Sequence, residues 1–411
     1  MKDKLKIALI GLGQRGMGVF EYEILKLDDI IIVGVCDSYE DRTNAAAELT
    51  QKVKGYTPVK STDYRDMLNL DIDAVVITCA WEDHIRIAVE ALKKGIYVGT
   101  EVAGAFSLDD CWRLVRASEE SGTPCMMLEN CCYGKRELML LNMVKSGFFG
   151  KVVHCTGMYG HYLADEILNG VKNRHYRLRN YIGRNCENYP THELVPIGKL
   201  LDINNGNRFL TLTSVASASY GLEEVVKNSD EFKDLKDTRF AQGDVVTTTI
   251  KCANGETVTI TLDTTLPRYY SRGLTVHGTK ATYIEDNDSL YEYPKHKQFT
   301  DPPHSKEIWG NMAEYEKDYL HPLWEGSTSG GGHGGMDPRC YRAFFDAAKA
   351  GINPPIDVYD TATYMAVSVL SEQSIALGGA PVYFPDFTNG RYLDRKDIVE
   401  YPYMLHKVEK K

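Results

Sequence analysis

Three glycines near the start of the chain, Gly11, Gly13 and Gly16, are spaced as G-x-G-x-x-G. They follow a short apolar run and precede an amphipathic segment, which predicts a strand, a tight turn and a helix whose first N–H groups face a pyrophosphate. Asp37 follows Gly16 at close to the roughly 20 residues expected of a ribose-binding acid. Because a carboxylate accepts from a ribose 2′-hydroxyl and repels a 2′-phosphate, Asp37 favours NAD over NADP. Arg42 lies nearby in the sequence and keeps NADP open as the alternative.

Two pairs of tyrosine and histidine between residues 157 and 192 have spacings that suit proton transfer. Tyr159 and His161 are two residues apart in GMYGHYL, which places both on one face of a strand. Tyr189 and His192 are three apart in NYPTH, and they share a face if the helix predicted over HELVPIGKLLDI begins before His192. Arg177 lies between these motifs and could stabilise developing negative charge or bind hydroxyl groups.

Two further motifs carry polar side chains that could reach a ligand. Tyr270 follows Tyr269 at the end of a predicted strand, and His333 and Asp337 lie in the glycine-rich run GSTSGGGHGGMD. All these motifs have a structural alternative, since most histidines and tyrosines serve packing and a glycine run fits a loop with positive φ angles. No Ser/His/Asp order, P-loop or metal-binding spacing competes. The residues alone therefore predict a nicotinamide-dependent oxidoreductase with a His/Tyr acid–base site.

The first 128 residues alternate predicted strands and helices, which is typical of a parallel sheet with right-handed crossovers. We therefore predict an α/β fold with a Rossmann domain at 1–128 and a substrate-binding α+β domain at 129–411. Ligands of a parallel sheet bind at the carboxyl ends of its strands. Those ends fall at Gly11–Arg15, Asp37, Ala80–Trp81, Glu101–Val102 and Glu129–Asn130.

The second half has the pattern of a mainly antiparallel open sheet. Two alternating strands flank Asn254-Gly255, a strong hairpin signal, and two more flank a Gly-Thr-Lys turn in GLTVHGTKATYIED. The apolar patterns of 337–351 and 359–379 predict helices. In contrast, 293–335 is rich in Pro, His and Gly and is predicted to be a long loop.

The composition of the 411 residues is that of a globular enzyme, and it limits the classes of partner that the protein can bind. A net charge of −10 without any basic block argues against nucleic acid and anionic membranes. The apolar run at the N-terminus lacks a cleavage-site pattern, and no stretch approaches the ~20 residues of a membrane span, so a cytoplasmic protein is expected. The 10 scattered cysteines have no zinc-binding spacing and are expected to be free thiols, with no metal site.

The chain also resembles known families. Its first part is similar to the Gfo/Idh/MocA oxidoreductases, in which a late strand of the nucleotide domain usually ends in Glu-Lys-Pro, whereas TEVAGAF places Val102 at the Lys position. It resembles more strongly glycoside hydrolase family 109, the NAD-dependent α-N-acetylgalactosaminidases. Glu193 and Tyr392 depart from that family's pattern, where Gly and Trp are usual. The matching stretches are ENCCYG at 129–134, GMYGHY at 157–162, YRLR at 176–179, NYPTHELVP at 188–196, GGHGGMD at 331–337 and FPDFTNGRY at 384–392.

The resemblance implies which residues hold the ligands. Together with the glycine motif, the implied NAD contacts are Gly11, Gly13, Gln14, Arg15, Gly16, Asp37, Trp81, His84, Glu101, Val102, Asn130 and Tyr189. The expected substrate contacts are Tyr159, His161, Arg177, Tyr189, His192 and Tyr270. Tyr159, Tyr189 and His192 are the candidates for proton transfer, and the division between acid and base stays open.

The activity implied by the resemblance is glycoside hydrolysis, with α-N-acetylgalactosaminides as one candidate substrate. NAD oxidises the C3 hydroxyl, the ketone acidifies the C2 hydrogen, the C1 aglycone is eliminated, water adds and the hydride returns. This route needs no paired carboxylates at glycosidase spacing. The alternatives are an NAD-dependent sugar or inositol dehydrogenase, against which Val102 argues, and an inactive sugar- or nucleotide-sensing protein, against which the Tyr/His/Arg set argues. A homo-oligomer is expected, because an open sheet face often dimerises.

Overall fold

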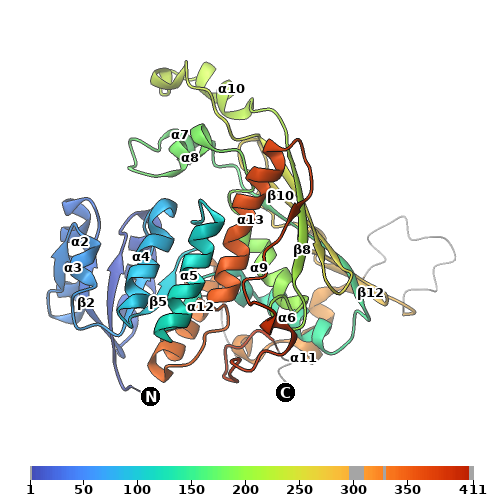
Figure 1. The fold of residues 1–411 in the computed structure, drawn as a ribbon, viewed down its shortest axis with the longest axis horizontal. Coiled ribbons are helices and arrows are strands. Elements are labelled where there is room, and N and C mark those ends of the chain that lie inside the picture. The colour runs from blue at the N-terminus through green and yellow to red at the C-terminus, as the bar shows by residue number, and fades with distance from the viewer. Residues whose placement is uncertain (1, 296–309, 327–329, 407–411) are drawn as a thin grey trace. The chain divides into compact units, whose positions relative to one another are not determined.

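The computed structural model describes residues 2–295, 310–326 and 330–406, and these form two compact units (Figure 1). The first unit consists of residues 1–134, 327–366 and 396–405. The second unit consists of residues 135–326, 367–395 and 406–411. The division that the sequence predicts after residue 128 lies near the first transition between units. It does not include the two later segments with which the chain returns to the first unit.

The first unit contains a six-stranded parallel sheet of order β3-β2-β1-β4-β5-β6. Its strands are β1 (Leu5–Ile10), β2 (Ile30–Cys36), β3 (Val59–Ser61), β4 (Ala74–Ile77), β5 (Tyr97–Thr100) and β6 (Cys125–Met127). The strand order reverses between β1 and β4, and ligands of such sheets bind where the order reverses. The central strands β4 and β5 are buried throughout, as expected when helices cover both faces of a parallel sheet.

Helices flank this sheet (Figure 1). They are α1 (Gln14–Tyr22), α2 (Glu40–Lys54), α3 (Tyr64–Met67), α4 (Trp81–Lys93), α5 (Leu108–Ser121) and α12 (Gly332–Ala350), with the short 3₁₀ helices η1 (Ile24–Lys26) and η2 (Asn130–Tyr133). Local sequence sets α5, since the Ser107 hydroxyl accepts from the Asp110 N–H and Gly122 ends the helix at a φ of 66°. Helix α12 packs on the sheet at Gly99 of β5, where an added Cβ would lie only 2.8 Å from the Phe344 ring. The absence of a side chain at Gly99 therefore makes room for this ring.

The second unit contains a nine-stranded sheet of order β14-β13-β12-β11-β7-β10-β9-β8-β15. Its strands are β7 (Val152–Gly160), β8 (Phe209–Ala216), β9 (Val245–Cys252), β10 (Thr257–Asp263), β11 (Thr275–Gly278), β12 (Ala281–Ile284), β13 (Ser289–Glu292), β14 (Gly310–Asn311) and β15 (Val382–Tyr383). Among the described strands of this sheet, β7 and β10 pair in parallel and the other neighbours pair antiparallel, so the predicted, mainly antiparallel sheet is confirmed. The pairs β9–β10 and β11–β12 are the two predicted hairpins.

Short helices accompany this sheet, and one of them lies directly on β7. The helices are α6 (Lys135–Lys145), α7 (Ala164–Leu168), α8 (Arg177–Gly183), α9 (Thr191–Leu200), α10 (Gly221–Lys227), α11 (Glu316–Tyr319), η3 (Lys233–Leu235), η4 (Glu285–Asn287), η6 (Met312–Tyr315), η7 (Pro322–Trp324) and η8 (Arg391–Leu393). A Cβ on Gly157 of β7 would lie 2.5 Å from the Glu193 side chain, so this glycine lets α9 approach the strand closely. Helix α13 (Val358–Ala376) begins in the first unit and ends in the second.

One sequence prediction of the second half is corrected. The predicted long loop at 293–335 contains β14, η6, α11 and η7 within its described part, because the local apolar residues Met312, Tyr315 and Trp324 are buried. Residues 296–309 and 327–329 of that prediction lie outside the described residues.

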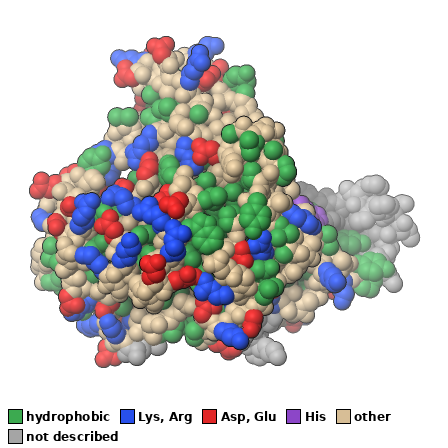
Figure 2. All heavy atoms as spheres, viewed as in Figure 1, with side chains coloured by type: hydrophobic (Ala, Val, Ile, Leu, Met, Phe, Trp, Pro, Cys, Tyr) green, Lys and Arg blue, Asp and Glu red, His purple; other side chains and the backbone are tan. Residues whose placement is uncertain are grey.

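The surface carries charges of both signs. On the face drawn in Figure 2, Lys and Arg side chains are interspersed with Asp and Glu side chains. This mixture is in keeping with the absence of any basic block from the sequence. Within the described ranges, no helix combines the length and the apolar character that a membrane crossing requires.

Candidate active site

The turn after β1 has the backbone geometry that a pyrophosphate-binding loop requires. Gly11 has a φ of 102°, and a Cβ added there would lie 2.3 Å from the backbone nitrogen of Cys79. A Cβ on Gly16 would lie 2.1 Å from the carbonyl oxygen of Gly11. Helix α1 begins at Gln14 with Gly13 as its N-cap, a residue without a side chain to cap the first N–H groups. This is the arrangement in which a helix N-terminus binds a phosphate.

Asp37 lies beside this turn at the end of β2. Its buried carboxylate accepts hydrogen bonds from the backbone N–H groups of Leu12, at 2.6 Å, and Tyr39, at 3.0 Å. Arg42 lies with Nη1 3.5 Å from the same carboxylate. Arg42, which left NADP as an alternative in the sequence, is therefore ion-paired with Asp37, the residue that favours NAD. Contact between Asp37 and a ribose stays a prediction.

Three other predicted NAD contacts lie around the ends of β4 and β5. Trp81 is the first residue of α4 and is buried, and Val102 is buried two residues after β5. His84 places Nδ1 3.1 Å from the carbonyl oxygen of Ala103 and Nε2 3.1 Å from that of Cys79. Burial lowers the pKa of His84, although both carbonyl groups oppose this shift. His84 thus connects the loop after β4 with the loop after β5, which gives it a structural role in addition to the predicted contact with NAD.

A cluster of polar side chains joins Arg15 to the late segment of the first unit. Arg15 donates from both terminal nitrogens to Asp337, at 2.8 and 2.9 Å, and from Nε to Glu101 at 2.9 Å. Tyr341 also donates to Glu101, at 3.2 Å. The sequence flags Arg15, Glu101 and Asp337 separately. It gives no signal for Tyr341 or for these pairings, because 86 to 322 residues separate the partners.

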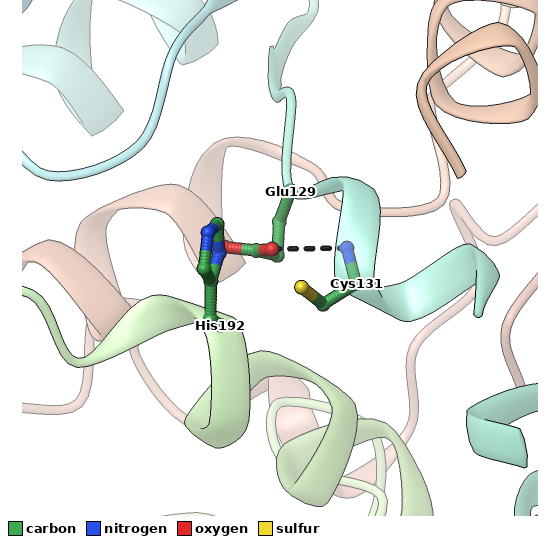
Figure 3. Close-up of side chains that lie close together, drawn as sticks. All are labelled: Glu129, Cys131 and His192. Carbon is green, nitrogen blue, oxygen red and sulfur yellow. Dashed lines mark hydrogen bonds between the residues drawn. The ribbon is translucent and has the colours of Figure 1, made fainter. Parts of the chain in front are cut away.

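The residues that follow β6 complete this cluster. Asn130 donates from Nδ2 to Asp337 at 2.7 Å. Glu129 is fully buried and accepts from the backbone N–H of Cys131 at 3.0 Å, which starts the 3₁₀ helix η2 (Figure 3). Although burial alone would raise it, hydrogen bonds from His333 and Arg15 hold the pKa of Asp337 well below its usual range. Asp337, which the sequence places at the end of a glycine-rich run, therefore joins the predicted NAD contacts Arg15 and Asn130 directly, and Glu101 through Arg15.

In the second unit, the predicted Tyr and His residues form one continuous set of ring contacts. The rings of Tyr159 and Tyr189 lie 4.3 Å apart between centroids at an angle of 30°. The Tyr159 hydroxyl lies 3.2 Å from Nδ1 of His161, whose ring packs edge-on against Tyr270 at 5.1 Å. Helix α9 begins at Thr191, so His192 lies in its first turn (Figure 3). Its Nε2 lies 3.5 Å from the Tyr189 hydroxyl.

Arg177 brings a positive charge to these rings. It begins α8, and its guanidinium carbon lies 5.1 Å from the centroid of the Tyr189 ring. Its Nε is 2.8 Å from Oε1 of Glu166 on α7, an ion pair that the sequence analysis missed. Burial raises the pKa of Tyr159, and the charge of Arg177 opposes this shift. The guanidinium is thus placed to stabilise negative charge on the phenol oxygens.

A second carboxyl that the sequence analysis missed lies two residues before Tyr189. Glu187 is buried, and its carboxyl accepts from the backbone N–H of Tyr189. Its own N–H donates to the Ser371 hydroxyl at 2.8 Å. Burial raises the pKa of Glu187 to about 8, so this carboxyl is mostly protonated at neutral pH. An isolated Glu in a polar loop has no sequence signature of burial.

The second unit therefore offers three phenols, two imidazoles and a guanidinium within one set of contacts. Tyr159, Tyr189 and His192 can each donate or accept a proton, and Arg177 can bind or stabilise an anionic oxygen. All six predicted substrate contacts lie in this set: Tyr159, His161, Arg177, Tyr189, His192 and Tyr270. Their contact with a substrate stays a prediction.

The parallel nucleotide-type sheet and the mainly antiparallel sheet define a two-domain oxidoreductase fold. Residues 5–129 match the oxidoreductase family with an NAD-binding Rossmann fold, called Gfo/Idh/MocA. Residues 133–394 match the model described as glycosyl hydrolase 109, C-terminal domain. The chain belongs to glycosyl hydrolase family 109, so the resemblance stated from its motifs is confirmed.

Individual relatives agree with this assignment. A glycosyl hydrolase family 109 protein of Stenotrophomonas maltophilia is 35% identical, covering 96% of this chain and 91% of the relative. An alpha-N-acetylgalactosaminidase of Tannerella forsythia is 36% identical, covering 95% of this chain and 88% of the relative.

Solved structures match the fold at low sequence identity. A levoglucosan dehydrogenase in complex with NADH and levoglucosan has a TM-score of 0.68 at 17% identity, covering 93% of this chain and 100% of that chain. The myo-inositol 2-dehydrogenase of Lactobacillus plantarum has a TM-score of 0.64 at 13% identity, with coverage of 93% and 100%. These likenesses confirm the fold class, and the match of residues 5–129 supports NAD(H) as the cofactor.

Proposed function

We propose that the protein is an NAD-dependent glycosidase that cleaves glycosides by transient oxidation at C3, with α-N-acetylgalactosaminides as the first candidates. One observation carries this proposal: a single chain matches both an NAD-binding oxidoreductase fold and a glycosyl hydrolase domain. Hydrolysis involves no net redox change. A dinucleotide-binding fold can therefore contribute to hydrolysis only if the hydride that NAD takes from the substrate is later returned to the substrate. The alpha-N-acetylgalactosaminidase of Tannerella forsythia supports the choice of sugar.

The residues of the first unit fit a bound NAD. Gly11 and Gly16 have no room for side chains, as the tight turn and the close packing of α1 in a dinucleotide-binding loop demand, and Asp37 presents a buried carboxylate beside the turn. Gly13, Gln14 and Arg15 would lie along the phosphates at the start of α1. When bound, NAD supplies the hydride acceptor at C3 and returns the same hydride later in the cycle.

The chain's own residues move protons in this scheme. A base takes the proton of the C3 hydroxyl, and a base takes the C2 hydrogen that the neighbouring ketone has made acidic. The bond between C1 and the aglycone then breaks as the C1–C2 double bond forms, and an acid can protonate the departing oxygen. Water adds its hydroxyl to C1, a proton returns to C2, and the C3 oxygen regains its proton. Tyr159, Tyr189 and His192 share these transfers, and Arg177 stabilises negative charge on oxygen.

Turnover of an aryl glycoside in heavy water tests the proposal. Elimination breaks the C2–H bond, so the released sugar should carry deuterium at C2 and keep its original hydrogen at C3. Proton NMR and mass spectrometry of the product measure both positions, and a thioglycoside serves as a second substrate because elimination needs little protonation of the leaving group. Released sugar without label at C2, or NADH accumulating while the glycosidic bond stays intact, would replace the proposal by a dehydrogenase.

A further inference from the structure

One carboxylate in the first unit, Asp337, accepts hydrogen bonds from residues of three separate parts of the chain. We propose that Asp337 is a positioning residue that fastens the segment 331–337 to the predicted NAD contacts and sets how slowly NAD leaves the protein. The inference rests on the proposed function only in taking NAD as the ligand of the first unit.

The contacts of Asp337 are strong and directional. The guanidinium of Arg15 donates to both carboxylate oxygens, at 2.8 and 2.9 Å, in the bidentate geometry of the strongest charged pairs. Asn130 donates to Oδ1 at 2.7 Å, and Nδ1 of His333 lies 2.7 Å from Oδ2. The Asp337 side chain is 3% exposed, so these bonds are shielded from water.

The backbone of the segment depends on such anchors. His333, Gly334 and Gly335 are consecutive residues with φ values of 49°, 64° and 94°. A non-glycine residue in this region is strained and is held there by its surroundings. At the other end, the N–H of Gly332 donates to the buried Glu23 at 2.8 Å. The segment is therefore fixed through Asp337 at one end and Glu23 at the other.

Arg15 transmits this anchoring to other predicted NAD contacts. Its guanidinium lies between two carboxylates, Asp337 and Glu101, so its charge is balanced inside the protein. Arg15 comes directly after the glycine turn, Glu101 follows β5 and Asn130 follows β6. Asp337 thus joins three strand ends at once, two directly and the third through Arg15. Pre-organised groups bind a ligand more tightly because less ordering remains to be done upon binding.

A matched control, at another carboxylate that pairs with α12, distinguishes a role of Asp337 in NAD retention from a purely structural role. Asp29 pairs with Arg342 of α12 at 3.1 Å and with Lys349 of α12, and neither of these partners is a predicted NAD contact. Asp29→Asn therefore removes a carboxylate that stabilises the packing of α12, while the strand-end cluster stays intact.

The experiment measures NAD retention rather than glycoside cleavage. The wild type, Asp337→Asn and Asp29→Asn are loaded with NAD and dialysed, and the NAD that remains bound is quantified at intervals after denaturation. Loss of charged hydrogen bonds worth about 1.5–3 kcal/mol corresponds to NAD loss at least ~10-fold faster in Asp337→Asn. Asp29→Asn should lose NAD at the wild-type rate even where its NAD-free form melts at a lower temperature.

His333→Ala keeps the test decisive if Asp337→Asn does not fold. The His333 side chain is 52% exposed and can be removed without opening the core, and its loss should speed NAD release by at least ~3-fold because one of the bonds to Asp337 is gone. Wild-type rates of NAD loss in Asp337→Asn or His333→Ala would overturn the proposal, as would equal acceleration in Asp29→Asn. Wild-type protein that keeps NAD but fails the heavy-water test would remove the proposed hydrolysis and leave this inference standing.

Discussion

Two buried carboxyl groups, Asp337 in the first unit and Glu187 in the second, have pKa values shifted in opposite directions. Asp337 is held below its usual pKa by hydrogen bonds from His333 and from the cation of Arg15, against the effect of burial. Glu187 is equally buried, and burial raises its pKa to about 8 with only the N–H of Tyr189 opposing the shift. Burial alone therefore does not decide the charge of a group; a nearby cation does.

The same contrast distinguishes the two candidate sites. Around Asp337, the Arg15 cation and the Asn130 amide donate to carboxylates at 2.7–2.9 Å, which makes a fixed framework. Around Tyr189, a phenol and an imidazole meet at 3.5 Å, a weak hydrogen bond. Catalytic hydrogen bonds are often long without substrate and tighten in its complex. We interpret the first region as built for holding a ligand and the second as built for moving protons.

The largest expected effect comes from breaking the charge balance of the first region. In Arg15→Met, Asp337 and Glu101 keep their charges without their cation, so the free energy of unfolding of the NAD-free protein should fall by about 3 kcal/mol. Urea denaturation measures this loss. Arg15→Met combined with Asp337→Asn should recover part of it, because one unbalanced carboxylate is then gone. A double variant as unstable as the sum of the two single changes would contradict the charge-balance interpretation.

Next in size is the effect of removing the proton carriers of the second region. His192→Ala and Tyr189→Phe should each lower turnover of an aryl glycoside by ~10²-fold or more, the usual scale of acid–base catalysis. Tyr220, exposed in the same unit, supplies the control, since Tyr220→Phe should leave turnover unchanged. Normal turnover in both site variants would show that these residues serve packing alone.

A smaller effect is expected at the predicted ribose contact. Asp37→Ala should weaken NAD binding by ~1.5–3 kcal/mol, the value of charged hydrogen bonds, and should improve the relative tolerance of NADP. Equilibrium titration of NAD-free protein with each dinucleotide measures both changes. Asp71→Ala, at a side chain 90% exposed in the same unit, is the control. An unchanged affinity for NAD would place the ribose elsewhere.

The smallest effect concerns the pH dependence of stability. Glu187 titrates near 4.5 when unfolded and near 8 when folded, so between these values the folded protein holds a proton that the unfolded chain has lost. The free energy of unfolding should therefore fall as pH rises, by up to about 1.4 kcal/mol between pH 6 and 7. Glu187→Gln should remove this part of the slope in urea denaturation at the two pH values. A slope that persists in Glu187→Gln would assign it to other groups.

The fold was predictable where its signals are local. The glycine turn, the alternation of strands and helices, and the Asn254-Gly255 hairpin each depend on neighbouring residues and are confirmed in the structure. The return of residues 327–366 to the first unit was not predictable, because it depends on contacts between segments far apart in the chain. A packing contact such as that between Gly99 and Phe344 leaves no periodic pattern in either segment.

The candidate site follows the same division. Spacing and family motifs pointed to Tyr159, Tyr189 and His192, and the structure places all three in contact. Glu166 and Glu187 were missed, since surface and buried glutamates look alike in a sequence. Only the folded structure shows that Glu166 pairs with the buried Arg177 and that Glu187 is buried.

The return of the chain to the first unit has a consequence for biosynthesis. Strands β1 to β6 are complete at residue 127, whereas α12, which covers β5 with Phe344, begins at residue 332, so the 204 residues 128–331 are made in between. At roughly 5–20 residues per second, translation of that interval takes about 10 to 40 s. During this time the nascent sheet lacks the helix that buries one of its apolar surfaces. Chaperones at the ribosome therefore have a defined surface to bind, and a defined interval in which to bind it.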